Sequence, residues 1–279
     1  MIHTSRQLKD LIKNRANGDS TKAQVILRNY MMERFLERMS ISEYKNNFIL
    51  KGGMLVSSMV GIDTRSTLDI DATLKNIPLS IKRVTDIIEE IISVKLEDEV
   101  FFSIKKVAEI MDETEYGGVR VSLIARLEMM NIPLKIDIST GDAITPREVE
   151  YGMRLMFEER EIEICAYNIE TLLAEKLETI LSRGTANTRL RDFYDLYILQ
   201  NSKKEMIDYN DFKLAFTATI NKRNSEQVSN EAEIIVDEIY KDKDMQKLWK
   251  AYQNKYDYAQ NVTWDMVMTS VKEFVNRIM

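Results

Sequence analysis

Hydrophobic residues recur at helical spacing along much of the chain. Residues 21–40 and 80–95 place apolar side chains every three or four positions, which puts them on one face of a helix. Both stretches are therefore predicted helices. Beyond residue 168 the same period continues to the end of the chain, in stretches near 169–182, 188–200, 210–220, 229–241, 243–257 and 263–278.

Shorter runs between the first helices alternate apolar and polar residues. Residues 100–107, 119–127 and 134–138 follow this pattern, which is typical of strands with one buried face. We expect turns at 112–118 and near Asn131 to separate them. A short apolar segment at 48–50 precedes a predicted helix that begins at Gly53.

The order of these elements predicts an α/β (α+β) fold, with a mixed sheet and flanking helices followed by an all-α C-terminal domain. The expected domains are residues 1–165 and 166–279. The 279-residue chain is 44% hydrophobic, which is enough for two real cores. Only three prolines and nine glycines interrupt it, so long regular elements are expected.

The most informative chemistry lies between residues 51 and 71. The glycine pair Gly52-Gly53 opens an apolar helix, where backbone amides can approach phosphate oxygens closely. Asp69 and Asp71 stand one residue apart around the apolar Ile70, so a strand would point both carboxylates to the same face. Such a pair is costly to keep ionised without a cation, and carboxylate oxygens suit Mg²⁺.

A third carboxylate follows on another predicted strand. Lys135 and Asp137 alternate there with Leu134, Ile136 and Ile138. A two-metal phosphoryl-transfer site needs two shared acidic ligands and one more that can accept a proton from the attacking hydroxyl. The alternative for Asp69 and Asp71 is a solvated turn at a strand end, but the apolar Ile70 between them is typical of a regular strand.

Composition excludes several other chemistries. The single histidine, His3, and the single cysteine, Cys165, rule out Ser-His-Asp and Cys-His sites, Cys/His zinc sites and a disulfide framework. Catalysis must then use carboxylates, lysines, hydroxyls and a hard metal. No apolar run resembles a signal peptide or a membrane span, so we expect a cytoplasmic protein without a membrane partner.

The net charge of −6 counts against a nucleic-acid partner. Two basic runs lessen this objection. The N-terminal run is interpreted as a solvated helix face, whereas residues 183–191, with three arginines, are the better candidate for binding. The aromatic residues Trp249, Tyr252 and Tyr256 have helical spacing, which favours core packing over base stacking.

At this point the chain resembles a known family. The matching motifs, in order over residues 48–199, are Gly52-Gly53, Arg65-x-Thr67-x-Asp69-x-Asp71, Lys135-x-Asp137, Glu175-Lys176 and Arg191-Asp192-x-x-Asp195-Leu196. They resemble the AbiEii/AbiGii-type abortive-infection toxins. Those are nucleotidyltransferase-like proteins of the DNA polymerase β superfamily, and they form the toxin halves of bacterial toxin–antitoxin pairs.

The resemblance implies a role for each motif. Asp69 and Asp71 would bind two Mg²⁺ ions, and Asp137 would complete the acidic triad and activate the acceptor hydroxyl. Lys176 would contact the nucleotide triphosphate and Asp192 would be the acid of the last motif. Gly52, Gly53, Arg65 and Thr67 would bind the NTP with Lys176, in a pocket that the helical domain closes.

One position departs from the superfamily pattern. Gly53 stands where the usual motif has serine, so a hydroxyl that would contact a nucleotide phosphate is absent. Ser57 or Ser58 are the candidates to replace it.

The predicted function is a metal-dependent nucleotidyltransferase toxin of a toxin–antitoxin, phage-defence system. It would transfer a nucleotide from NTP to an RNA acceptor, with a tRNA 3′ end suspected, and its antitoxin would be encoded nearby. Two alternatives stay open: a catalytically inactive nucleotide- or protein-binding module, and a metal-dependent sugar transferase, because Asp-x-Asp also holds nucleotide-sugar diphosphates. Labelled UDP-sugars would test the latter.

Overall fold

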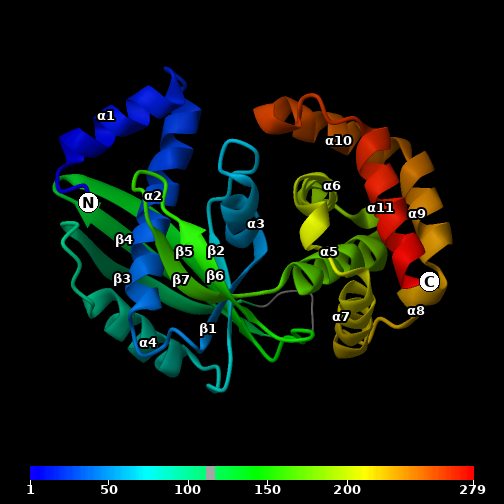
Figure 1. Cartoon of the computed structure of the whole chain (residues 1–279), viewed down its shortest axis with the longest axis horizontal. Coiled ribbons are helices and arrows are strands. Elements are labelled where there is room, and N and C mark those ends of the chain that lie inside the picture. Colours follow the sequence, from blue (N-terminus) through cyan, green and yellow to red (C-terminus); the bar gives the residue numbers. More distant parts are fainter. Residues whose placement is uncertain (111–116) are drawn as a thin grey trace. The chain divides into compact units, whose positions relative to one another are not determined.

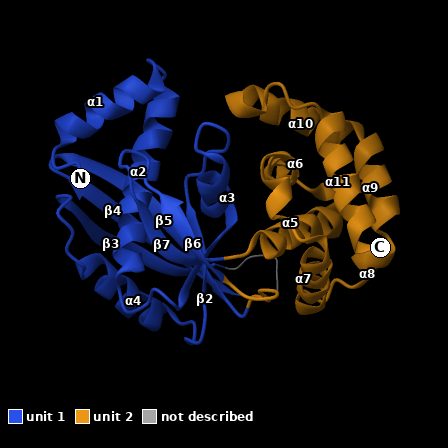
Figure 2. Cartoon of the chain, viewed as in Figure 1, with its two compact units in different colours: residues 1–141, 149–166 blue, residues 142–148, 167–279 orange. Residues whose placement is uncertain are grey.

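A computed structural model describes residues 1–110 and 117–279 of the chain. The chain forms two compact units, one of residues 1–141 and 149–166 and the other of residues 142–148 and 167–279 (Figure 2). Most of the turn predicted at 112–118 lies outside the described residues. A catalytic role for the first unit and a pocket-closing role for the second stay predictions.

The first unit contains a seven-stranded sheet in the order β3-β4-β5-β2-β1-β7-β6 (Figure 1). The pairs β2–β5 and β1–β7 are parallel and the other neighbours are antiparallel. This mixed sheet with flanking helices confirms the predicted fold class. The strands are β1 (Phe48–Lys51), β2 (Ile70–Leu74), β3 (Val100–Ile110), β4 (Gly118–Leu127), β5 (Met130–Thr140), β6 (Val149–Arg154) and β7 (Glu161–Ala166).

Helices α2 (Ser20–Ser40) and α4 (Ile81–Ser93) cover one face of this sheet. The Phe35 ring of α2 contacts Phe48 of β1 and Phe102 of β3, with ring centroids 6.4 and 6.1 Å apart. Each helix starts at a side-chain cap, since the Asp19 carboxylate and the Ser80 hydroxyl accept amide hydrogens of the first turn. Helices α1 (Ser5–Ala16) and α3 (Gly52–Val60) complete the unit.

Strand β4 shows how the sequence separates the two faces of the sheet. Its odd-numbered residues, from Val119 to Leu127, are buried, and they are all apolar. Arg120 and Arg126 point the other way and are exposed. We call the face that carries Arg120 and Arg126 the second face.

Two predictions need correction. Strand β2 begins at Ile70, so Asp69 precedes the strand and the expectation that both acids lie on it was wrong for Asp69. The reason is that Lys51, the last residue of β1, already pairs with Asp71, so β1 offers Asp69 no partner. The turn expected near Asn131 is a two-residue hairpin turn at 128–129.

The second unit is helical, as predicted. Its helices are α5 (Ile169–Arg183), α6 (Leu190–Lys203), α7 (Tyr209–Lys222), α8 (Gln227–Asn230), α9 (Ala232–Lys241), α10 (Lys243–Lys255) and α11 (Trp264–Ile278). Trp249 and Tyr252 of α10 are buried and stacked with centroids 5.1 Å apart, so the predicted core role is confirmed for these two residues. Tyr256 follows the end of α10 and is only half-buried. Within the described residues, no helix combines the length and the apolar character needed to cross a membrane.

Candidate functional site

Four charged residues form a row across four neighbouring strands of the first unit. Asp71 of β2 is in register with Asp137 of the parallel strand β5. Lys51 of β1 is in register with Asp71, and Arg120 of β4 with Asp137. Because paired residues share a face, the row runs lysine, aspartate, aspartate, arginine on the second face of the sheet. It brings together two of the three predicted metal ligands.

The outer arginine holds Asp137 through two hydrogen bonds. Nε of Arg120 donates to Oδ1 of Asp137 at 2.7 Å, and Nη2 donates to Oδ2 at 2.6 Å. This is the bidentate geometry in which a guanidinium binds a carboxylate most strongly. The pairing raises the pKa of Arg120. Both oxygens of the predicted proton acceptor are therefore engaged by Arg120.

Asp71 lies in a different electrostatic environment. Burial raises the pKa of its carboxyl, and the negative charges of Asp137 and Asp69 add to this effect. Lys51 and the amide of Gly53 act in the opposite direction. That amide donates to Oδ2 of Asp71 at 3.3 Å, so the predicted phosphate-binding backbone lies directly beside this row of four charged residues, which we call the acidic row after its two central aspartates.

Gly52 makes this close approach possible. Its φ of +62° lies in the left-handed region. A Cβ built there would lie only 2.8 Å from both Cβ and Cγ of Asp71, and it would contact Oδ2 as well. A side chain at residue 52 would therefore push Asp71 out of the row. Only glycine satisfies both the backbone conformation and the space.

The surroundings of Gly53 also leave no space for a side chain. A Cβ at this position would lie 2.8 Å from the Thr67 hydroxyl oxygen and 3.1 Å from Nη2 of Arg65. The hydroxyl nearest to the position where the superfamily has serine is thus that of Thr67. Ser58 donates to the carbonyl of Leu55 at 2.8 Å within its own helix. Thr67 and Arg65, both predicted to bind nucleotide, are almost fully buried here.

The Mg²⁺ ions that the resemblance implies would need oxygen donors close together. Carboxylate oxygens are the ligands that this hard cation prefers, and Asp71 and Asp137 present theirs side by side. Across residues 1–110 and 117–279, however, no group of three or more His, Cys, Asp or Glu side chains is arranged to hold a metal ion. Asp69 precedes the strand, and Asp137 is bound to Arg120. The donor chemistry fits the cation once the Asp137 carboxylate is no longer paired with Arg120.

The later motif residues lie in the second unit. Nζ of Lys176 on α5 is 2.6 Å from the carboxylate of Asp195 and 3.0 Å from that of Asp192, both on α6. Asp195 is completely buried and Lys176 is 8% exposed. Lys176 and Asp192, which the resemblance places in the site, therefore contact each other. Arg191 does not extend this cluster, because it donates to the Tyr256 hydroxyl at 2.7 Å.

No role was predicted from the sequence for Arg120 or Lys51, and Asp195 was predicted only as part of the last motif. The alternation of β4 and the position of Lys51 directly before the glycine pair were visible signals. Neither signal reveals the strand register that pairs Arg120 with Asp137.

A family model settles the identity of the chain. The model of the nucleotidyl transferase AbiEii toxin, of type IV toxin–antitoxin systems, matches residues 34–270. The chain belongs to the AbiEii family. This confirms the resemblance and makes the chain a nucleotidyltransferase and the toxin of a toxin–antitoxin system. Membership also implies a nucleotide substrate and an antitoxin partner.

Other comparisons add less to this AbiEii protein. No curated protein matches the chain. Two solved structures from Helicobacter pylori are similar to it, a proposed nucleotidyltransferase and JHP933. The first is 15% identical, covers 91% of this chain and 94% of its own, and has a TM-score of 0.49. JHP933 is 16% identical, covers 91% of each chain and has the same TM-score. At these values neither similarity carries a conclusion.

Proposed function

We propose that this chain is a divalent-metal-dependent nucleotidyltransferase that transfers a nucleotide from an NTP to an RNA acceptor in the bacterial cytoplasm, with a tRNA 3′ end as the suspected target. The observation that carries the proposal is the pairing of Asp71 with Asp137 beside the Gly52-Gly53 backbone. Two carboxylates with backbone amides beside them are groups that metal-assisted phosphoryl transfer uses.

Each acidic residue has its own role in this proposal. Asp71 and Asp137, with Asp69, would hold Mg²⁺, which when bound neutralises triphosphate charge and lowers the pKa of the acceptor hydroxyl. Asp137 would take the proton from that hydroxyl. The hydroxyl oxygen bonds to the α-phosphorus as the bond to the β-phosphate oxygen breaks, and pyrophosphate leaves.

The nucleotide would be held from the glycine side of the row. The Gly53 amide makes only a long bond to Asp71, so it can turn to a phosphate oxygen at small cost. The guanidinium of Arg65 and the hydroxyl of Thr67 adjoin Gly53. Lys176 and Asp192 keep the triphosphate-binding and acidic roles that their motifs predict.

Incubation of the purified chain with total bacterial RNA, Mg²⁺ and each α-³²P-labelled NTP in turn tests the proposal. The control is the Asp69→Ala, Asp71→Ala double variant. Label in a discrete RNA band that the variant fails to produce would support transfer and would identify nucleotide and acceptor. No incorporation from any of the four nucleotides would contradict the proposal.

The second candidate is a member of this family held in an inactive state, which binds nucleotide without transferring it. Its support is the engagement of both Asp137 oxygens by Arg120. It predicts measurable NTP binding with no product under any divalent metal. It also predicts that Asp137→Asn leaves NTP binding unchanged.

A further inference from the structure

The second face of β3, β4 and β5 extends away from the acidic row as an exposed surface. Lys106, Ser122 and Lys135 form the next row, because Ser122 pairs with Lys106 on one side and with Lys135 on the other. Two rows further on, Arg126 pairs with Phe101 and Asn131. At about 3.3 Å per residue, Lys135 is roughly 7 Å and Arg126 roughly 20 Å along the strands from the acidic row.

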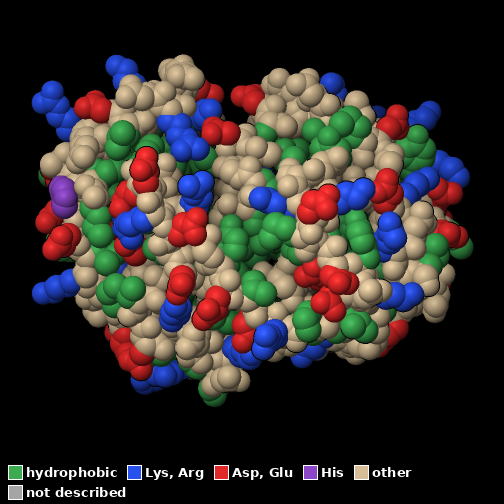
Figure 3. Space-filling view, viewed as in Figure 1, with side chains coloured by type: hydrophobic (Ala, Val, Ile, Leu, Met, Phe, Trp, Pro, Cys, Tyr) green, Lys and Arg blue, Asp and Glu red, His purple; other side chains and the backbone are tan. Residues whose placement is uncertain are grey.

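This surface is basic although the chain is acidic overall. Asp137 is the only acidic residue of these three strands on the second face, and Arg120 already neutralises it. Lys106 and Lys135 are exposed and form no ion pair within the part of the chain that the structure describes. On the side of the molecule shown in Figure 3, acidic and basic side chains are mixed. A locally cationic surface is therefore present in a chain whose net charge is −6.

Protection of an exposed sheet edge explains only part of this pattern. Strand β3 is at the edge of the sheet, where lysines discourage pairing with other chains, and Lys106 fits that role. Arg126 and Lys135 belong to β4 and β5, which have neighbours on both sides. Their charges therefore need another explanation.

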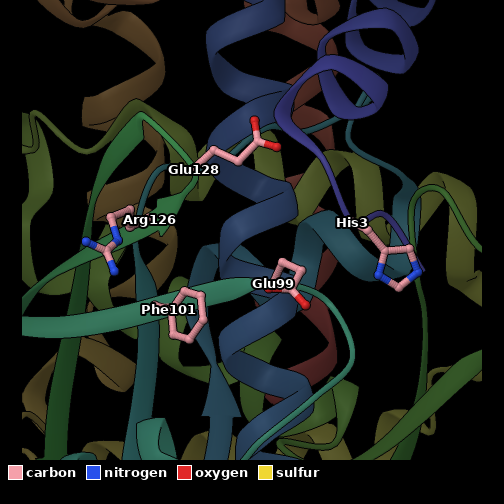
Figure 4. A pocket seen from close by; sticks show the side chains of 5 residues that line it. All are labelled: His3, Glu99, Phe101, Arg126 and Glu128. Carbon is pink, nitrogen blue, oxygen red and sulfur yellow. The ribbon is translucent and has the colours of Figure 1, made fainter.

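An exposed aromatic residue lies at the far end of the surface. Phe101 is 57% exposed, and the guanidinium of Arg126 lies 5.7 Å from the centre of its ring. Both line a small pocket with His3, Glu99 and Glu128 (Figure 4). Glu128 accepts hydrogen bonds from the backbone and hydroxyl of Ser5, which reduces its repulsion of a phosphate. A cation beside an accessible ring is the combination that binds an unpaired nucleotide by backbone and base together.

We propose that the second face of β3, β4 and β5 binds the acceptor as a single-stranded polynucleotide, whose phosphates contact Lys106, Lys135 and Arg126 and one of whose bases stacks on Phe101. The strand would then lead to Asp137, where its terminal hydroxyl reacts. Unpaired bases expose the ring faces that Phe101 can contact, whereas a duplex does not. This inference rests on the proposed function, since it assigns the route of its acceptor.

The test is binding of a fluorescein-labelled single-stranded RNA of mixed sequence, measured by anisotropy without nucleotide over a range of salt concentrations. The variant carries Lys106→Glu, Arg126→Glu and Lys135→Glu. The matched control carries Arg6→Glu, Lys9→Glu and Lys13→Glu on the exposed side of α1, with the same change in net charge.

We expect the second-face variant to bind at least roughly tenfold more weakly at about 0.1 M salt. The slope of log affinity against log salt should fall by about 2, since each phosphate contact contributes about 0.7 for single strands. The α1 control should change binding by less than about twofold. Equal losses in both variants, or an unchanged second-face variant, would overturn the proposal. Equally effective competition by a duplex of the same sequence would do so too.

Two additions keep the result interpretable. If the charge-reversed chain does not fold, the corresponding three glutamine substitutions replace it, with weaker binding again expected and unchanged binding overturning the proposal. Labelled nucleotide transfer is measured in parallel. RNA binding that the second-face variant loses, without transfer in the wild type, would reject the proposed function and leave only the RNA-binding surface supported. Transfer with an unchanged KM for RNA in the second-face variant would reject the inference alone.

Discussion

Arg120 and Asp137 face each other on neighbouring strands, and the guanidinium binds both carboxylate oxygens at 2.6 and 2.7 Å. A divalent cation that needs Asp137 must therefore compete with a positive charge already in place. Arg120 is 45% exposed, so its side chain has room to leave the carboxylate without rearrangement of the sheet.

Removing this competitor should strengthen metal binding. We expect Arg120→Gln to bind Mn²⁺ roughly tenfold more tightly than the wild type, because a hydrogen bond to a charged group contributes about 1.5–3 kcal/mol. Isothermal titration of the nucleotide-free chain measures this. Asp137→Asn serves as the control and should bind more weakly than either. An Arg120→Gln variant with weaker binding would mean that Arg120 positions Asp137 for the metal.

Gly52→Ala should destabilise the first unit. The alanine would need a positive φ, at about 1–2 kcal/mol, and its Cβ would also meet Asp71. Gly18→Ala is a matched control, because Gly18 has φ +86° and no heavy atom within 4 Å of the added Cβ. Urea unfolding should show a larger loss for Gly52→Ala. Equal losses in the two variants would show that Asp71 moves away freely.

The contact between residue 53 and Thr67 predicts compensation between two substitutions. Gly53→Ser alone should weaken ATP binding and lower stability, because the serine Cβ meets the Thr67 hydroxyl. Thr67→Ala alone should weaken ATP binding by removing that hydroxyl. The double variant should bind better than either single variant, with a coupling energy of about 1 kcal/mol. If calorimetry shows that the losses of ATP-binding free energy in the two single variants simply add in the double variant, the predicted compensation is refuted.

Asp192 and Asp195 share Lys176 but should respond differently to substitution. Asp195→Asn removes the fully buried carboxylate of an ion pair and should lower the free energy of unfolding of the second unit by about 3 kcal/mol. Asp192 keeps 17% side-chain exposure, so Asp192→Asn should cost about 1 kcal/mol or less and mainly reduce nucleotide transfer. Thermal unfolding and the labelled-NTP assay separate the two effects. If Asp192→Asn proved the more destabilising and Asp195→Asn mainly reduced transfer, Asp192 would have the structural role and Asp195 the functional one.

Glu33 should make the first unit less stable as the pH rises. Burial raises the pKa of its carboxyl from 4.5 to about 7, although the Met156 amide donates to both of its oxygens. The folded state then holds a proton that the unfolded state has released, so stability falls between about pH 4.5 and 7. At about 1.4 kcal/mol per pKa unit, the loss is about 3 kcal/mol.

Glu33→Gln isolates this effect, because glutamine keeps an acceptor for Met156 and does not titrate. The difference in unfolding free energy between variant and wild type should grow from pH 4.5 to pH 8. A constant difference over that range would contradict the assignment.

Local pattern was sufficient for most elements of the fold. The strand at 119–127 was predictable because only one of its faces is buried, and the C-terminal helices because their apolar stripes are regular. Asp69 was misplaced because strand pairing, which ends at Lys51 and Asp71, decides where β2 begins. Asp137 binds Arg120, which is 17 positions away, and Gly53 lies against Thr67, which is 14 positions away. Strand register brings the first pair together, and the path of the loop before β2 brings the second pair together. Periodicity carries no information on such contacts.

The two units are not consecutive pieces of the chain. Residues 142–148 belong to the second unit, and the chain then returns to the sheet before α5 begins. Asn168, at the start of α5, donates to the carbonyls of Thr145 and Arg147 at 2.8 and 2.9 Å. During synthesis, every strand is therefore complete before the ribosome has made the partners of 142–148. A cut after residue 166 would leave that segment without them, so we expect the two halves not to fold as independent proteins.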